Sequence, residues 1–166
     1  MNLQKYKECI NELDDRKLRT LAQAIDDAKQ VIILGNGGSN GISSHISQDY
    51  TKKLGKRSLC FDSAARMSCY ANDYGWENAY MMFLEHFAEE GTLVILISSS
   101  GNSANILNAA EYCRAHGLAT VLMSGFSAGN ALRFNWKPYA VVDFYVNSDD
   151  YGIVESVHEV ILHSVI

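Results

Sequence analysis

Residues 98–103 read Ser-Ser-Ser-Gly-Asn-Ser and form the most chemically specific pattern in the chain. They follow an apolar run typical of a buried strand and precede a segment with helical character. Several hydroxyls, a glycine and an amide at a helix N-terminus can surround the oxygens of a phosphomonoester with neutral donors. The simpler alternative, a serine that caps the helix, does not account for four serines. The pattern therefore predicts a phosphate-binding loop.

A second loop, residues 35–41, reads Gly-Asn-Gly-Gly-Ser-Asn-Gly and also lies between an apolar run and a helical segment. Glycines allow close approach of the backbone to a ligand, and a helix N-terminus attracts anions. A dinucleotide site is a rival interpretation, but the third glycine of its G-x-G-x-x-G pattern would fall on Asn40. A P-loop would end in Gly-Lys-Ser/Thr, which this loop does not. We therefore expect an anion-binding loop and no nucleotide cofactor.

Candidate acid–base groups lie on two helical segments. His45 and Asp49 are four residues apart and share one helix face, while Glu155, Glu159 and His163 lie on successive turns of the last segment. Two facing helices of this kind would supply carboxylates and imidazoles for proton transfer or for a divalent metal. Many ion pairs on helix surfaces have no function, however, and periodicity does not say whether the two helices face each other.

The elements that must position these groups follow from the hydrophobic pattern. The apolar runs that suit buried strands are residues 31–34, 92–97 and 119–123, with weaker candidates at 58–61 and 139–146. Helical segments are expected at about 42–54, 64–72, 77–88, 103–116 and from 150 onward. Alternating strands and helices predict a parallel sheet with helices on both sides. In such a sheet ligands bind beyond the carboxyl ends of the strands, where both polar loops lie.

Length and composition indicate one α/β domain over residues 1–166, with a helical segment at 1–30 and the core at 31–166. The formal charge of -5, without a basic stripe, argues against a nucleic-acid partner. Apolar runs are too short to span a membrane. The four cysteines have no metal-site spacing, and the N-terminus has no apolar signal. We therefore expect a cytoplasmic protein whose cysteines are small buried side chains.

Three blocks resemble the phosphoheptose isomerases: residues 35–39, 71–75 and 97–106, in the same order and with compatible spacing. These are SIS-domain (sugar isomerase) enzymes that convert sedoheptulose 7-phosphate to glycero-manno-heptose 7-phosphate. The resemblance, which extends from about residue 20 to the end, implies a flavodoxin-like three-layer α/β/α sandwich with a five-stranded parallel sheet. It also implies a homotetramer with active sites between subunits, and a place in carbohydrate metabolism, in lipopolysaccharide or capsule heptose synthesis.

The resemblance also implies roles for particular residues. Those that would hold the phosphate are Ser39, Ser98, Ser99, Ser100 and Ser103, with Gly37 and Gly38 in the first loop. Those that would contact the sugar are Asn36, Asn72 and Asp73, and Glu155 is a further substrate-binding position. The catalytic positions of the family fall on Asp49 and His163. In family members that bind zinc, the ligand positions correspond to His45, Asp49, Glu155 and His163.

Three of these positions depart from the family. Asp49 stands in place of glutamate, Glu155 in place of glutamine and Lys53 in place of arginine. Two neighbouring carboxylates favour a cation between them, so we expect zinc rather than an empty site. The chain is expected to be a phosphosugar aldose–ketose isomerase that works through an enediol. The alternative is a non-catalytic SIS module that binds a sugar phosphate for regulation or assembly, which would show binding without turnover.

Overall fold

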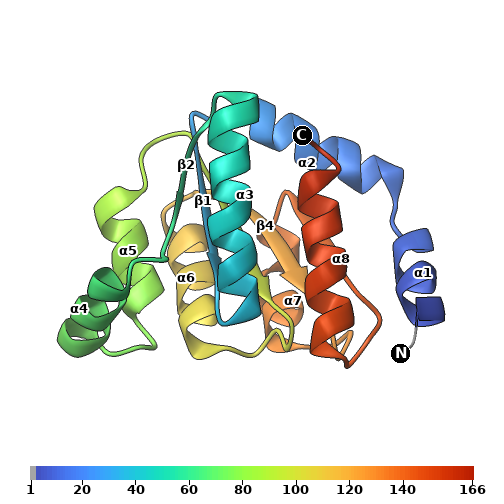
Figure 1. Ribbon diagram of the computed structural model, residues 1–166. Coiled ribbons are helices and arrows are strands. Elements are labelled where there is room, and N and C mark those ends of the chain that lie inside the picture. Colours follow the sequence, from blue (N-terminus) through green and yellow to red (C-terminus); the bar gives the residue numbers. More distant parts are fainter. Residues whose placement is uncertain (1–2) are drawn as a thin grey trace.

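The computed structural model describes residues 3–166 as an α/β/α sandwich around one parallel sheet (Figure 1). The strand order is β2-β1-β3-β4-β5, and every neighbouring pair is parallel. The strands are β1 (Gln30–Gly35), β2 (Arg57–Cys60), β3 (Thr92–Ser98), β4 (Ala119–Ser124) and β5 (Val142–Tyr145). The helices are α1 (Leu3–Asn11), α2 (Asp15–Asp27), α3 (Gly38–Leu54), α4 (Ala64–Tyr74), α5 (Ala79–Phe87), α6 (Ala104–Ala115), α7 (Ala131–Trp136) and α8 (Tyr151–His163), with a 3₁₀ turn at Lys137–Tyr139. The expected fold class is confirmed.

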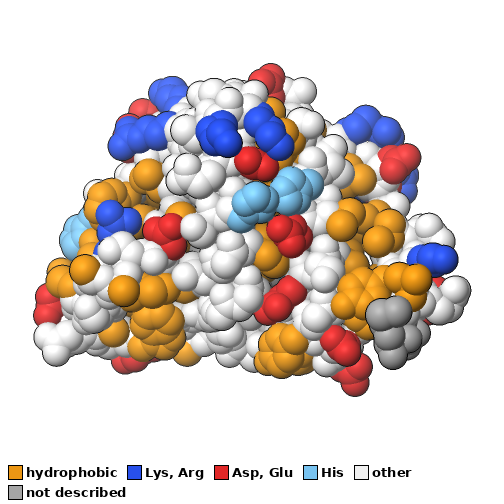
Figure 2. All heavy atoms as spheres, viewed as in Figure 1, with side chains coloured by type: hydrophobic (Ala, Val, Ile, Leu, Met, Phe, Trp, Pro, Cys, Tyr) orange, Lys and Arg blue, Asp and Glu red, His pale blue; other side chains and the backbone are white. Residues whose placement is uncertain are grey.

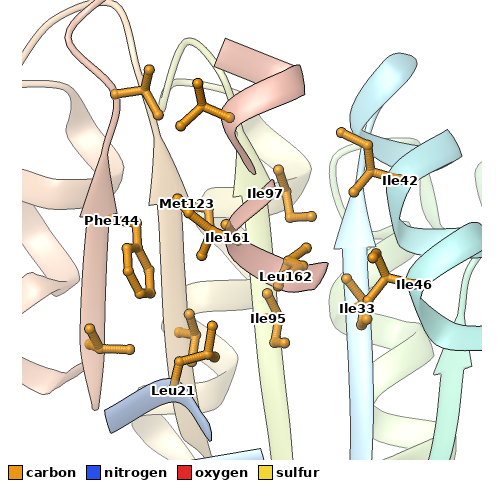
Figure 3. Packing of buried hydrophobic residues seen from close by; sticks show 14 of the residues in the cluster. Leu21, Ile33, Ile42, Ile46, Ile95, Ile97, Met123, Phe144, Ile161 and Leu162 are labelled. Atoms are coloured by element: carbon orange, nitrogen blue, oxygen red, sulfur yellow. The ribbon is translucent and has the colours of Figure 1, made fainter. Parts of the chain in front are cut away.

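Each face of the sheet has its own hydrophobic core, because successive strand residues point to opposite sides. In β1, Ile33 faces the core shared with α1, α2, α3 and α8, while Ile32 and Leu34 face the core shared with α5, α6 and α7. Figure 3 shows the first core, in which Ile42 and Ile46 of α3 pack beside strand residues. Near-continuous apolar strands are therefore required, as the sequence pattern indicated.

Helices α3 and α8 pack against each other on one face of the sheet, and α6 and α7 lie on the other (Figure 1). The carboxyl ends of β1 and β3 are adjacent, with Gly35 paired to Ile97. The chain leaves β1 towards β2 and returns in β3 on the other side, so the loops after these two strands meet at a topological switch point. This arrangement brings the glycine loop and the serine loop together.

Several local expectations need correction. Helix α3 begins at Gly38 rather than at residue 42, because the glycine loop supplies its first turn. Helix α7 was not expected; it is short and buries only Leu132, so its periodicity is weak. Cys69 is exposed, whereas the other three cysteines are buried. Within residues 3–166, none of the helices has the length and apolar character needed to cross a bilayer.

His158 of α8 is fully buried and ties this helix to the end of β4. Its Nε2 donates to the Ser124 carbonyl oxygen at 3.2 Å, while Nδ1 has no partner among the described residues. A carbonyl oxygen can only accept, so Nε2 carries the proton of a neutral ring. Burial lowers the pKa of His158 to about 4, so the ring stays neutral in the folded protein at neutral pH.

We expect the free energy of unfolding to fall as the pH drops from about 6.5 to 4. Over this range the unfolded chain takes up a proton at His158 and the folded protein does not, which costs about 3 kcal/mol by pH 4. His158→Gln should flatten this part of the profile in urea unfolding measured between pH 7 and 4. The control is His116→Gln at an exposed histidine, which should leave the slope unchanged. An equally steep slope in His158→Gln would contradict the prediction.

Candidate active site

The two polar loops line one cavity of about 340 Å³ at the carboxyl edge of the sheet. The lining residues are Asn36, Gly37, Gly38, Ser39, Ile97, Ser98, Ser99, Ser100, Ser103, Tyr151 and Glu155. Helices α3 and α6 both begin at this cavity, and in neither does the N-cap residue provide a side-chain cap. Free backbone N–H groups and the positive ends of two helix dipoles therefore favour an anion here.

The serines of the second loop differ in what they do. Ser98 and Ser100 organise the loop: their hydroxyl oxygens accept from the Gly101 and Asn102 N–H groups at 3.1 and 3.2 Å. The Ser99 hydroxyl is buried and has no hydrogen-bond partner among the described residues. Ser103 stands at the N-cap position of α6, yet its hydroxyl does not cap the helix. The simple capping alternative is therefore not what the structure shows, and a buried unpaired hydroxyl needs a ligand or water.

The first loop owes its shape to glycine. Gly37 has a φ of 58°, in the region that disfavours other residues. At Gly35 a Cβ atom would lie 2.8 Å from the Ser39 backbone, so the turn into α3 could not be this tight with a larger residue. Ser39, the second residue of α3, is consequently buried and lines the cavity.

Glu155 lies in this cavity rather than beside the other expected metal ligands. A Cβ atom at Gly38 would overlap the Glu155 carboxylate, which shows that the carboxylate rests on the first turn of α3. The lining contains no lysine or arginine among the described residues, so Glu155 is the only charged side chain at the phosphate position. The carboxylate lies at the helix N-terminus, the position that favours an anion.

We predict that Glu155→Gln strengthens binding of inorganic phosphate about tenfold at neutral pH, because it removes a negative charge from the cavity at nearly constant shape. Titration calorimetry measures this directly. The matched control is Glu159→Gln, one turn further along α8, which lines a groove between α3 and α8 but not the serine loop. Weaker binding by Glu155→Gln would mean that the carboxylate assists the ligand instead.

The acid–base candidates form a second cluster along the seam between α3 and α8. His45 Nε2 and His163 Nε2 lie 3.9 and 3.6 Å from Asp49 Oδ2, and the two rings are 5.1 Å apart between centroids. Figure 2 shows two adjacent histidines on this face, with acidic side chains above and below them. The cluster lies about 9 Å or more along α3 from Ser39, since a helix rises 1.5 Å per residue. This separation suits a ligand longer than a phosphate group alone.

Asp49 is held in its ionised form. The Lys53 ammonium donates to Asp49 Oδ2 at 3.1 Å, and this bond lowers the pKa of Asp49 below its ordinary value. Desolvation acts in the opposite direction, and the charges of Lys53 and His45 lower the pKa further. The Asp49 side chain is only 13% exposed, so the carboxylate is a shielded proton acceptor at neutral pH.

His163 presents a free nitrogen to this carboxylate. Its Nδ1 lies 3.2 Å from the Glu159 carbonyl oxygen, which can only accept, so Nδ1 carries the proton in the neutral ring. Nε2 then has a lone pair directed at Asp49 Oδ2. A carboxylate oxygen and an imidazole nitrogen placed this close suit a cation between them.

The donor set fits zinc. One ligand atom each from His45, Asp49 and His163 lies within 4.8 Å of the others. Zinc bonds of 2.0–2.2 Å imply ligand atoms roughly 3.4 Å apart in a tetrahedron, close to the distances found. Three protein ligands with a fourth open position are typical of a catalytic zinc site. Glu155, the fourth expected ligand, is not part of this group, because it lies against Gly38 instead.

Asn72 and Asp73 lie apart from both groups. They are exposed near the end of α4, where the Asn72 amide donates to the Asp73 carboxylate at 2.9 Å. Helix α4 lies at the opposite side of the molecule from α8 (Figure 1). Neither residue lines the cavity of this chain, so a contact with sugar would require a different subunit's site.

Three residues at the site were missed by sequence reasoning. Tyr151 lines the cavity beside Glu155, and Tyr80 and Asn105 hold Asn36 from below. The position of Tyr151 at the start of α8 was a usable signal, because a helix that follows a strand begins at the ligand edge. Tyr80 gave no such signal, since an aromatic residue in an apolar helix face is typical of the core.

Comparison with known proteins agrees with this architecture. Residues 7–125 match the SIS domain family. The chain is 31% identical to a phosphoheptose isomerase of Fusobacterium nucleatum, over 96% of this chain and 85% of that protein. It is 32% identical to a phosphoheptose isomerase of Mycobacterium bovis, over 92% of this chain and 83% of the relative. The solved structure of a phosphoheptose isomerase from Neisseria gonorrhoeae, at 18% identity, superposes with a TM-score of 0.86 over 98% of this chain and 90% of that one.

The match to more than half of the chain, together with these relatives, establishes the class. The chain belongs to the SIS-domain family, and the resemblance to the phosphoheptose isomerases is confirmed.

Proposed function

We propose that the protein is a phosphosugar aldose–ketose isomerase that interconverts sedoheptulose 7-phosphate and the corresponding aldose phosphate. The observation that carries this proposal is the pairing of a serine-lined anion cavity with a His163–Asp49 acid–base pair along one helix seam. The relatives named phosphoheptose isomerase support the choice of sugar. The non-catalytic alternative is not favoured, because it would leave this pair without a role.

In the proposed mechanism the serine loop and the first turn of α3 hold the phosphate. Ser99 supplies an unpaired hydroxyl, and Ser103, which accepts from Ser98 at 3.3 Å, still has its own O–H to donate. The ring-opened sugar then extends along the seam towards Asp49. The ionised carboxylate removes the proton from the carbon beside the carbonyl, which gives an enediol. The Asp49 carboxyl, whose proton can exchange with solvent at this stage, then delivers a proton to the neighbouring carbon, while His163 Nε2 moves a proton between the two sugar oxygens.

The group of His45, Asp49 and His163 would also hold zinc, which would then occupy the Asp49 and His163 lone pairs that handle protons without it. When bound, it would polarise the two reacting oxygens as a Lewis acid. The role of this chain is to fix the ligand geometry, through the Glu159 carbonyl that orients His163 and through Lys53, which steadies the carboxylate.

We further propose a cytoplasmic homotetramer built from a single SIS domain of residues 1–166 that supplies heptose for lipopolysaccharide or capsule. Large exposed apolar side chains support an oligomer: Trp76 is 43% exposed, Phe134 79% and Tyr139 61%. A tetramer could also bring Asn72 and Asp73 of one subunit to the cavity of another. Analytical ultracentrifugation tests the assembly.

Proton NMR with sedoheptulose 7-phosphate in deuterated water, with and without zinc, tests the function. Deuterium at the carbon beside the carbonyl, together with a new anomeric signal, is the expected result. Line broadening of the sugar signals without exchange would instead support the binding-only alternative. If neither broadening nor exchange is observed, sedoheptulose 7-phosphate is not the ligand.

A further inference from the structure

Beneath the cavity, the side-chain amides of Asn36 and Asn105 form a reciprocal pair. Asn36 Nδ2 donates to Asn105 Oδ1, and Asn105 Nδ2 donates to Asn36 Oδ1, both at 2.9 Å. The two residues are 69 positions apart: Asn36 lies in the loop after β1, and Asn105 lies in the first turn of α6, the helix that follows β3. Asn105 is 2% exposed, whereas Asn36 lines the cavity.

The orientation of this pair is fixed from the α6 side. The backbone N–H of Ile106 is shared between Asn105 Oδ1 and the Ser103 carbonyl oxygen, both at 3.0 Å, and an amide nitrogen in place of this oxygen would set two donors against each other. The nitrogen of the Asn105 amide then faces Asn36, which requires the oxygen of Asn36 at that point. Turning either amide over would set two oxygens or two N–H groups against each other.

Counting donors and acceptors shows what remains for a ligand. Asn36 Oδ1 accepts from Asn105 and lies 3.0 Å from the Tyr80 hydroxyl, which also donates to the Gly35 carbonyl. The one proton of Tyr80 is shared between these two oxygens, so both contacts of Asn36 Oδ1 are with protein side chains. One N–H of Asn36 is given to Asn105, and the second has no partner among the described residues. The free polar group of Asn36 is thus a donor.

We propose that Asn105 is a positioning residue that makes Asn36 present an N–H, and not a carbonyl oxygen, to an oxyanion in the serine-lined cavity. A donor here complements the Ser99 hydroxyl and the first amides of α3, in a cavity whose described lining has no cationic side chain. Asn105 itself does not line the cavity, so its effect passes through Asn36. The inference rests on the anion-binding part of the proposed function.

The test is a double-mutant cycle on binding of inorganic phosphate, measured by calorimetry, with Asn105→Ala, Asn36→Ala and the double variant. Asn105→Ala is expected to weaken binding about tenfold, the effect of one hydrogen bond to a charged ligand. In the Asn36→Ala background the same change should weaken binding less than twofold, because the group that Asn105 orients is already gone. A purely structural role would give the same loss in both backgrounds.

Asn108→Ala is the matched control, since Asn108 lies one turn further along α6 and bonds to Glu77 and Asn78 outside the cavity. It should leave phosphate affinity unchanged. Equal losses in the two backgrounds, no loss in Asn105→Ala, or a similar loss in Asn108→Ala would each overturn the inference. If phosphate binding follows the expected double-mutant cycle but the sugar is not turned over, only the isomerase proposal is refuted. If the wild-type protein binds no phosphate, the inference about Asn105 and the proposed function are both refuted.

Discussion

Asp49→Asn is expected to lower kcat by about a thousandfold, within the range that general acid–base catalysis contributes. The asparagine side chain has nearly the same shape and can still accept the bond from Lys53, so the fold and the α3 surface are preserved. What is lost is a carboxylate whose lowered pKa keeps it ionised at neutral pH, so that it can accept a carbon-bound proton. Turnover would be followed by NMR with sedoheptulose 7-phosphate.

Asp62→Asn is the matched control for this charge change. Asp62 is an exposed aspartate close to α3, where its carboxylate accepts from the Ser44 hydroxyl at 2.7 Å, and it lines neither part of the site. Its turnover should stay within a factor of two of wild type. Zinc content of both variants, measured on the purified proteins, separates loss of a metal ligand from loss of a base. If Asp49→Asn keeps more than a tenth of the wild-type kcat, Asp49 is not the base.

Asp143→Ala is expected to lower the free energy of unfolding by about 3–5 kcal/mol, the cost of leaving one partner of a buried ion pair alone. Asp143 of β5 is 4% exposed, and its carboxylate accepts three contacts of 3.0–3.1 Å from the Arg133 guanidinium. Arg133 also donates to the Ala128 carbonyl and lies over the Tyr145 ring. The pair therefore fastens α7 to the edge of the sheet.

Urea unfolding measures this loss, and two further variants interpret it. In the double variant Asp143→Leu/Arg133→Met the unpaired charge is gone, so much of the stability should return. Glu111→Ala removes the partner of Arg114 in a pair on the surface, where solvent screens the charges, and it should change stability far less. Equal losses in Asp143→Ala and Glu111→Ala would show that burial does not set the cost.

The fold followed from the sequence because its strongest signals were local. Residues 92–97 are apolar on both faces, which only a central parallel strand tolerates, and the strand observed is β3 with one more residue. Loops directly after parallel strands lie at the carboxyl edge of the sheet. The serine and glycine loops therefore line one cavity, as expected. Helix α7 was not predicted, because a helix with one buried leucine shows no hydrophobic periodicity in the sequence.

The arrangement of side chains within the site was harder to predict from the sequence. The spacing of Glu155 and His163 placed them on one face of α8, but which α3 residue each meets depends on how the two helices pack. Glu155 meets Gly38, and His163 meets His45 and Asp49, about two turns further along. The Asn36–Asn105 pair depends on β1 and β3 being neighbours in the sheet. No pattern around either residue in the sequence predicts it. Helix packing and strand order, rather than composition, decide such contacts.

The bond between Lys53 and Asp49 makes the lysine an internal rival of any metal. A divalent ion that took Asp49 Oδ2 as ligand would compete with an ammonium group for the same oxygen. The measured affinity is then the intrinsic affinity multiplied by the fraction of molecules whose carboxylate is free. In the proposed metal-bound form, Lys53 would therefore raise the concentration of free metal needed to fill the site, and it would favour ions that bind strongly enough to compete with the ion pair.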